Sequence, residues 1–87
     1  MTQVKAYLFT RVGCHLCDEA REAIKKLPSK YQLAVIEIDV DDRSEDQAKY
    51  GDKVPVLVIN NGPSIESFIN EKTLRRALDR IPKNVAF

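Results

Sequence analysis

The spacing of hydrophobic positions changes along the chain, and each change marks an expected element. Residues 4–9 form a short run of mainly apolar, β-favouring side chains, which predicts a strand. From His15 onward the apolar residues follow helical spacing as far as Leu27, and Pro28 cannot extend that helix. Residues 33–40 are rich in β-branched side chains and alternate with acids toward their end, which predicts a second strand.

The next stretch predicts a short helix and a third strand. Ser44 opens a Ser-Glu-Asp-Gln capping box for a helix over residues 45–50. We expect Gly51 to end this helix in the left-handed conformation that glycine adopts readily. Pro55 then opens a strand over residues 56–59, since proline is tolerated at the first position of a strand.

The chain closes with a fourth strand and a last helix. Residues 60–63 (Asn-Asn-Gly-Pro) carry a strong turn signal, and residues 65–68 form the brief strand expected after it. Asn70 can cap a helix whose apolar stripe reaches Ile81, and Pro82 is expected to end it.

The expected elements follow one another in the order β-α-β-α-β-β-α. A helix joins the first two strands, so these should be parallel, whereas the tightly connected third and fourth strands should be antiparallel. The predicted fold class is therefore α/β, with a mixed four-stranded sheet flanked by helices. With 87 residues, the chain is long enough for one small domain spanning residues 1–87.

Composition and charge narrow the classes of function. The chain is 44% hydrophobic and 31% charged with a formal net charge of +1, which argues against general nucleic-acid binding. No apolar run is long enough to span a membrane and the first residues do not resemble a signal peptide, so we expect no membrane partner. We expect a cytoplasmic monomer, and in a reducing cytosol paired cysteines are more often catalytic or metal-binding than structural.

Charge is unevenly distributed along the chain. Acidic residues are concentrated in residues 37–52, whereas basic residues dominate the last helix and the tail. We interpret both regions as solvated faces, which keep a small domain dispersed in water. A docking surface for a partner protein is the alternative.

The two cysteines, Cys14 and Cys17, stand three positions apart where a strand leads into a helix. Free backbone N–H groups and the positive end of the helix dipole favour a thiolate at Cys14, and the thiolate is the nucleophile. Cys17, one turn further into the helix, is positioned to resolve a mixed disulfide. The hypothesis is a disulfide exchange in which Cys14 attacks and Cys17 completes the reaction.

Two neighbours can tune this chemistry, and two other interpretations compete with it. Arg11 can place a permanent cation near the thiolate, while His15 either modulates the redox potential or faces solvent as a bystander. A closed zinc site is disfavoured, because beyond the cysteines the chain offers one histidine and a structural site needs four ligands. Two inert buried thiols remain an alternative.

The CHLC motif at the helix start and the Val-Pro pair before the third strand resemble the thioredoxin superfamily. Within it, residues 7–20 and 50–57 are most similar to glutaredoxins, and above all to small glutaredoxin-like proteins with a CHLC-type motif. The element order agrees with that family over nearly the whole chain. The resemblance therefore implies a thioredoxin-like, glutaredoxin-type fold and thiol–disulfide oxidoreductase activity.

The resemblance also assigns roles to residues. It implies a nucleophilic Cys14, a resolving Cys17 and a cis peptide between Val54 and Pro55 beside them. It gives the Val54 backbone the role of pairing with glutathione or a substrate peptide, and Arg11 the role of meeting a glutathione carboxylate. No tightly bound cofactor is implied. Glutathione is the expected reductant, and disulfide-containing proteins or glutathione are the expected partners.

The chain departs from the glutaredoxin pattern at three places. His15 and Leu16 stand between the cysteines in place of a Pro-Tyr or similar pair, and we expect them to line the substrate site without an aromatic ring. Lys53 replaces the usual threonine, and residues 65–71 contain no glycine where a Gly-Gly pair cradles glutathione. A side chain in that stretch can crowd an approach that glycine permits. The motifs thus favour thiol–disulfide chemistry more strongly than glutathione specificity.

Two functions of other classes remain open. The first is a non-catalytic binding module that uses the thioredoxin-like scaffold and its Val54-Pro55 edge to hold a partner peptide. The second is a metal or iron–sulfur carrier in which cysteine thiolates from two chains share a site. The electron donor is open as well, between glutathione and a thioredoxin-type reductase.

Overall fold

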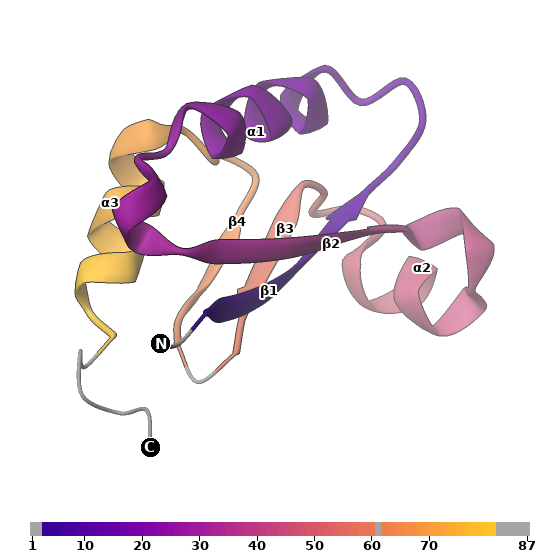
Figure 1. Ribbon diagram of the computed structural model, residues 1–87. Coiled ribbons are helices and arrows are strands. Elements are labelled where there is room, and N and C mark those ends of the chain that lie inside the picture. Colours follow the sequence, from indigo (N-terminus) through magenta and orange to yellow (C-terminus); the bar gives the residue numbers. More distant parts are fainter. Residues whose placement is uncertain (1–2, 61, 82–87) are drawn as a thin grey trace.

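Helix α1 (His15–Lys26) carries the chain from strand β1 (Val4–Thr10) back to the start of strand β2 (Leu33–Asp39), so that the two strands run parallel (Figure 1). The computed structural model describes residues 3–60 and 62–81. The first elements are β1 (Val4–Thr10), α1 (His15–Lys26), a 3-10 turn η1 (Ser29–Tyr31) and β2 (Leu33–Asp39). All of β1 pairs with β2, which confirms the predicted parallel arrangement.

The rest of the sheet is antiparallel. The later elements are a 3-10 turn η2 (Val40–Asp42), α2 (Ser44–Tyr50), β3 (Val56–Ile59), β4 (Ser64–Glu66) and α3 (Glu71–Asp79). β3 pairs with β1 and β4 with β3, so the strand order across the sheet is β2-β1-β3-β4. The predicted element order, mixed sheet and α/β class are confirmed. Among the described residues, no helix combines the length and the apolar character needed to cross a membrane.

The main core lies between one face of the sheet and helices α1 and α3 (Figure 1). Leu8 and Leu57 of the sheet and Leu74 of α3 are almost completely buried there. Because side chains alternate along a strand, Phe9 of β1 points to the opposite face, where its ring stacks on the Tyr50 ring with centroids 4.2 Å apart. The end of β1 that leads to the cysteines is therefore packed on both faces.

Helix α2 begins one residue earlier than predicted. Its N-cap is Arg43, which leaves η2 in an extended conformation and accepts the Gln47 N–H at its carbonyl, 3.0 Å away. Ser44 is thus the first helical residue, and its predicted capping role is wrong. Gly51 has a φ of −53°, so the predicted left-handed conformation is wrong as well. Glycine is required there because a Cβ would collide with the Gln47 carbonyl and lie 3.2 Å from the Arg11 guanidinium.

Two strands end earlier than predicted. β2 stops at Asp39, whose side chain accepts a backbone N–H two residues further on at 2.9 Å and thereby starts η2 at Val40. β4 covers Ser64–Glu66 in place of residues 65–68. Its end is set by Ser67, whose φ of 67° lies in the left-handed region and turns the chain out of the sheet.

The last helix starts where it was predicted to start. Asn70 caps α3 by accepting the Thr73 N–H at 2.9 Å, while its own N–H donates to the Thr73 hydroxyl. Ile81 lies beyond the end of the helix and packs against the main core. Pro82, the predicted terminator, lies outside the described residues, as does Asn61 of the predicted turn.

Candidate active site

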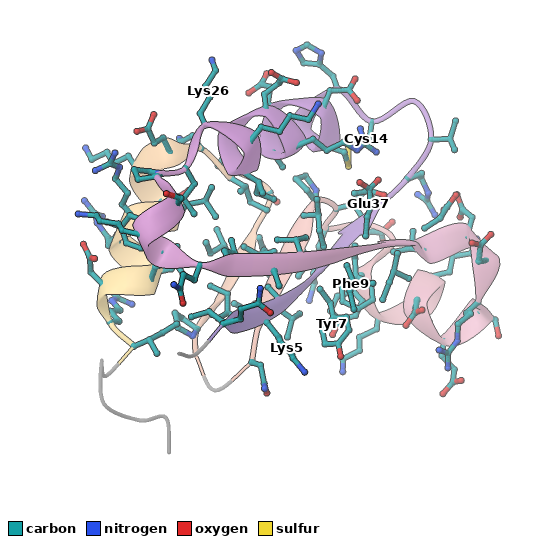
Figure 2. The ribbon with its side chains drawn as sticks, in the orientation of Figure 1. Lys5, Tyr7, Phe9, Cys14, Lys26 and Glu37 are labelled. Carbon is teal, nitrogen blue, oxygen red and sulfur yellow. A yellow bond between two sulfur atoms is a disulfide. The ribbon has the colours of Figure 1, made fainter. Side chains whose placement is uncertain are left out.

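Cys14 and Cys17 form a disulfide at the N-terminus of α1, with Cα atoms 5.2 Å apart (Figure 2). Cys14 is the N-cap residue, and its sulfur accepts a hydrogen bond from the Cys17 N–H at 3.1 Å. Cys14 is half-buried, whereas Cys17 is completely buried. Cys14 is therefore the cysteine that a molecule in solvent can reach more easily.

The loop before Cys14 is a tight turn that starts where β1 ends. The Cys14 N–H donates to the Arg11 carbonyl at 3.2 Å, and Gly13 has a φ of 81°. A Cβ at Gly13 would meet no atom within 4 Å, so the left-handed backbone alone favours glycine there. The turn delivers the Cys14 sulfur to the N-terminus of α1, where free N–H groups and the helix dipole stabilise a thiolate.

A cis peptide bond joins Val54 to Pro55 just before β3, as the family resemblance implied. β3 runs antiparallel to β1 with Val56 opposite Phe9, so this peptide lies at the end of the sheet where β1 leads into the cysteine loop. Pro55 is fully buried and Val54 is half-buried. Within the described residues, no backbone hydrogen bond engages the Val54 N–H or carbonyl.

The Arg11 side chain forms an ion pair with Asp41, and these two residues follow the ends of the neighbouring strands β1 and β2. Its Nε and Nη2 donate to the Asp41 carboxylate at 3.1 and 3.0 Å, and its Nη1 donates to the Gly51 carbonyl at 3.1 Å. The hydrogen bond from Arg11, followed by one from Gln47, lowers the pKa of Asp41 below its usual value. Three of the five guanidinium N–H groups are thus engaged, and the predicted contact of Arg11 with a thiolate or a glutathione carboxylate stays a prediction.

A second ion-pair network joins α1 to β2. Arg21 of α1 donates to both carboxylate oxygens of Glu37 at 2.7–3.0 Å, and these hydrogen bonds are the main cause that lowers the pKa of Glu37. Thr10, only 3% exposed, donates its hydroxyl to the same carboxylate at 3.0 Å. Figure 2 shows Glu37 pointing from β2 toward the end of α1 that carries Cys14. Sequence reasoning missed this network, which braces the cysteine-bearing helix on the sheet.

Comparison with models of protein families assigns the chain to one family. The family model described as "Glutaredoxin-like domain (DUF836)" matches residues 5–79. The chain belongs to this glutaredoxin-like family. The match runs from within β1 to the end of α3 and includes both cysteines.

Solved structures share the fold of this glutaredoxin-like domain. A structural-genomics target from X. campestris, determined by X-ray methods, is 32% identical with a TM-score of 0.75, and the match covers 88% of this chain and 99% of that one. A protein from Nitrosomonas europaea, determined by NMR in solution, is 26% identical with a TM-score of 0.71 and coverages of 87% and 92%. A malarial protein, 15% identical with a TM-score of 0.73 and coverages of 92% and 98%, shares the fold alone.

The predicted site residues of the glutaredoxin-like domain fall into two groups. Cys14, Cys17, Val54 and Pro55 lie at one end of the sheet, where β1 ends and β3 begins. His15 instead faces solvent, with its side chain 85% exposed and its Nε2 3.1 Å from the Glu19 carboxylate. Leu16 is half-buried. The roles of His15 and Leu16 toward a substrate stay predictions.

The described residues offer no ready metal centre. In residues 3–60 and 62–81, no three or more histidine, cysteine, aspartate or glutamate side chains form a group suited to hold a metal ion. An iron–sulfur or metal site that draws thiolates from two chains stays an untested alternative.

Glu37→Gln is expected to lower the free energy of unfolding by about 1 kcal/mol near neutral pH, because the ion pair with Arg21 is lost. The folded-state pKa of Glu37 lies below its unfolded-state value, so the pair stabilises the fold above about pH 4.3 and this contribution is lost as the pH falls through the folded-state value. Urea unfolding of wild type and variant at neutral pH and at about pH 3 measures the difference.

The two unfolding free energies should converge in acid. Glu22→Gln, at an exposed α1 position whose carboxylate lies 3.7 Å from Lys25, is the matched control and should show little effect at either pH. If Glu37→Gln lowers the free energy of unfolding by the same amount at both pH values, Glu37 acts through packing and not through its charge.

Proposed function

We propose that this glutaredoxin-like domain is a dithiol–disulfide oxidoreductase that reduces protein disulfides or mixed disulfides with glutathione. The observation that carries the proposal is the Cys14–Cys17 disulfide at the N-terminus of α1, with Cys14 the more accessible partner. A helix N-terminus favours the thiolate that exchange needs as its nucleophile. The open Val54 backbone supports docking of an extended substrate beside it.

The exchange consists of two attacks by sulfur on sulfur. The Cys14 thiolate attacks the substrate disulfide, a mixed disulfide forms, and the other substrate sulfur leaves as a thiolate that takes up a proton. Cys17 then loses its proton and attacks the Cys14 sulfur, which forms the Cys14–Cys17 disulfide and releases the second substrate thiol. Two electrons pass from the dithiol to the substrate. The Cα separation of 5.2 Å lets the second attack occur without a large movement of α1.

An external thiol must return the oxidised pair to the dithiol. We propose glutathione as this donor, since two glutathione molecules that become one disulfide supply the two electrons, and a thioredoxin-type reductase is the other candidate. Neither donor requires a tightly bound cofactor in this chain. The proposed compartment is the cytosol, whose glutathione pool is reducing, and a monomer suffices because one chain carries both cysteines.

The proposal is tested by equilibrating the purified protein in a series of glutathione redox buffers, quenching with acid and weighing each species. The expected result is a loss of two hydrogens as the Cys14–Cys17 disulfide forms. A glutathione adduct that accumulates in Cys17→Ser would support glutathione as donor, and a disulfide without any adduct would support protein substrates. A pair that stays reduced in the most oxidising buffer would overturn the proposal in favour of the non-catalytic binding module.

A further inference from the structure

Two large exposed hydrophobic side chains flank the candidate active site. Val12 is 85% exposed in the loop two residues before Cys14, and Phe68 is 68% exposed just after β4. Single exposed apolar residues are ordinary on protein surfaces. These two lie on segments next to the candidate site, Val12 on the cysteine loop and Phe68 directly after Ser67, whose N–H is bonded to the Pro55 carbonyl.

The sheet register places Phe68 at the same end of the sheet as the cysteine loop. Phe9 of β1 pairs with Val56 of β3, and Val56 pairs with Glu66 of β4. Beyond these pairs, the Ser67 N–H donates to the Pro55 carbonyl at 2.8 Å, which holds the end of β4 against the cis peptide. The start of β3 therefore lies between the end of β1, which leads to the cysteine loop, and the end of β4, which leads to Phe68.

Phe68 is held outward by a strained backbone. Ser67 has a φ of 67°, a left-handed conformation that is unfavourable for a non-glycine residue. Two hydrogen bonds maintain it, from Ser67 to Pro55 as above and from the Phe68 N–H to the Glu66 carbonyl at 2.7 Å. The fold thus retains strain beside the disulfide while it leaves an aromatic ring in water. Strain of this kind is characteristic of ligand-contact sites.

Glutathione carries two carboxylates and one ammonium, and two basic side chains near the disulfide already have carboxylate partners. The Arg11 guanidinium is already bound to Asp41, and the His15 imidazole lies against Glu19. Lys53 is an exposed cation next to Val54 and can meet one of these carboxylates. The exposed Val12 and Phe68 side chains offer apolar contacts that a peptide with apolar side chains can use and that the largely polar glutathione cannot match.

We propose that the preferred substrate is a protein disulfide in an extended segment whose apolar side chains flank the reacting cysteine. One of these side chains packs on Phe68 and another on Val12, while the Val54 N–H and carbonyl pair with the backbone of the segment. The chemistry is the exchange described above, so this inference rests on the proposed function. Glutathione then acts as the donor to the oxidised pair and is not the favoured disulfide substrate.

Two synthetic disulfide-linked peptides and oxidised glutathione test the inference. Leucines flank the cysteine in the first peptide and serines flank it in the second, and kcat/KM is measured for wild type, Phe68→Ser and Ile36→Ser. Wild type is expected to favour the leucine peptide about tenfold over the serine peptide, and Phe68→Ser is expected to reduce that ratio to about twofold or less. Ile36 is 56% exposed on β2, on the sheet face opposite α1, so Ile36→Ser should keep the wild-type ratio.

The outcomes separate the inference from the function on which it rests. Equal wild-type rates on both peptides, a clear preference for oxidised glutathione, or an unchanged ratio in Phe68→Ser would each overturn the inference while the oxidoreductase proposal stands. If wild type reduces none of the three disulfides, both proposals fail. A ratio that falls equally in Ile36→Ser would show that general surface polarity, and not Phe68, sets the preference, which also overturns the inference.

Discussion

Cys14→Ser is expected to reduce kcat/KM for disulfide exchange by on the order of 10³-fold or more while the fold is retained. A serine hydroxyl does not ionise near neutral pH, so the variant lacks the nucleophile. Serine is among the preferred N-cap residues, and its oxygen can accept the Cys17 N–H that the Cys14 sulfur accepts at 3.1 Å. Urea unfolding against reduced wild type should therefore show little change, which assigns the loss to chemistry.

Cys17→Ser is the informative partner variant. It keeps the Cys14 thiolate but removes the buried thiol that would attack the mixed disulfide, so the mixed disulfide should accumulate and be detected by mass on Cys14. Exchange that survives in Cys14→Ser, or adducts found on Cys17 in that variant, would reverse the order of attack proposed above.

The acidic stretch of residues 37–52 illustrates how the structure refines an interpretation from composition. From the sequence these acids form a solvated face or a docking surface. In the structure, Glu37 binds Arg21 of α1 and Asp41 binds Arg11 of the cysteine loop. Part of the acidic charge therefore fixes both segments that position the disulfide, and simple solvation does not account for it.

Features set by local interactions were predicted closely from the sequence. The Asn70 cap of α3 depends on Thr73, three residues away, and the Cys14 cap of α1 depends on Cys17. Some errors are local as well, such as the capping role of Ser44 and the end of β2 at Asp39, whereas others lie where distant contacts take over. Gly51 is expected to be a left-handed helix end, yet its lack of a side chain avoids the Gln47 carbonyl and also admits Arg11, 40 positions away in the sequence. Local propensity carries no information about such a neighbour.

The candidate site likewise combines features set by a local motif with features set by distant contacts. The cysteine spacing is a local motif, so the disulfide at the start of α1 was predictable. Glu37 was not, because its partner Arg21 lies 16 positions away and only the β1–β2 register, with Glu37 opposite Leu8, turns its side chain toward α1. The left-handed Ser67 was also missed, since that backbone conformation usually signals glycine and residues 65–71 contain none.

Leu57→Ala is expected to lower the free energy of unfolding by about 3 kcal/mol. Leu57 is completely buried at the centre of β3, opposite Leu8 of β1 and Ile65 of β4, so its removal leaves a cavity that three strands border. A chain of this size is stabilised by about 4–13 kcal/mol in total. The variant should therefore unfold at a much lower urea concentration, measured with the slope of the transition unchanged.

Leu33→Ala is the matched control, because it deletes the same atoms at a half-buried position at the start of β2 and should lower the free energy of unfolding by about half as much.

The same substitution at Leu57 should also affect substrate binding. Leu57 follows Pro55 by two residues, so a less rigid β3 would position the Val54 backbone less firmly. Below the unfolding transition, Leu57→Ala should therefore raise KM for peptide disulfides, whereas alkylation of the reduced Cys14 thiol should keep its wild-type rate, since that thiol is set by α1. Equal destabilisation by the two variants would show that the centre of β3 does not carry the core.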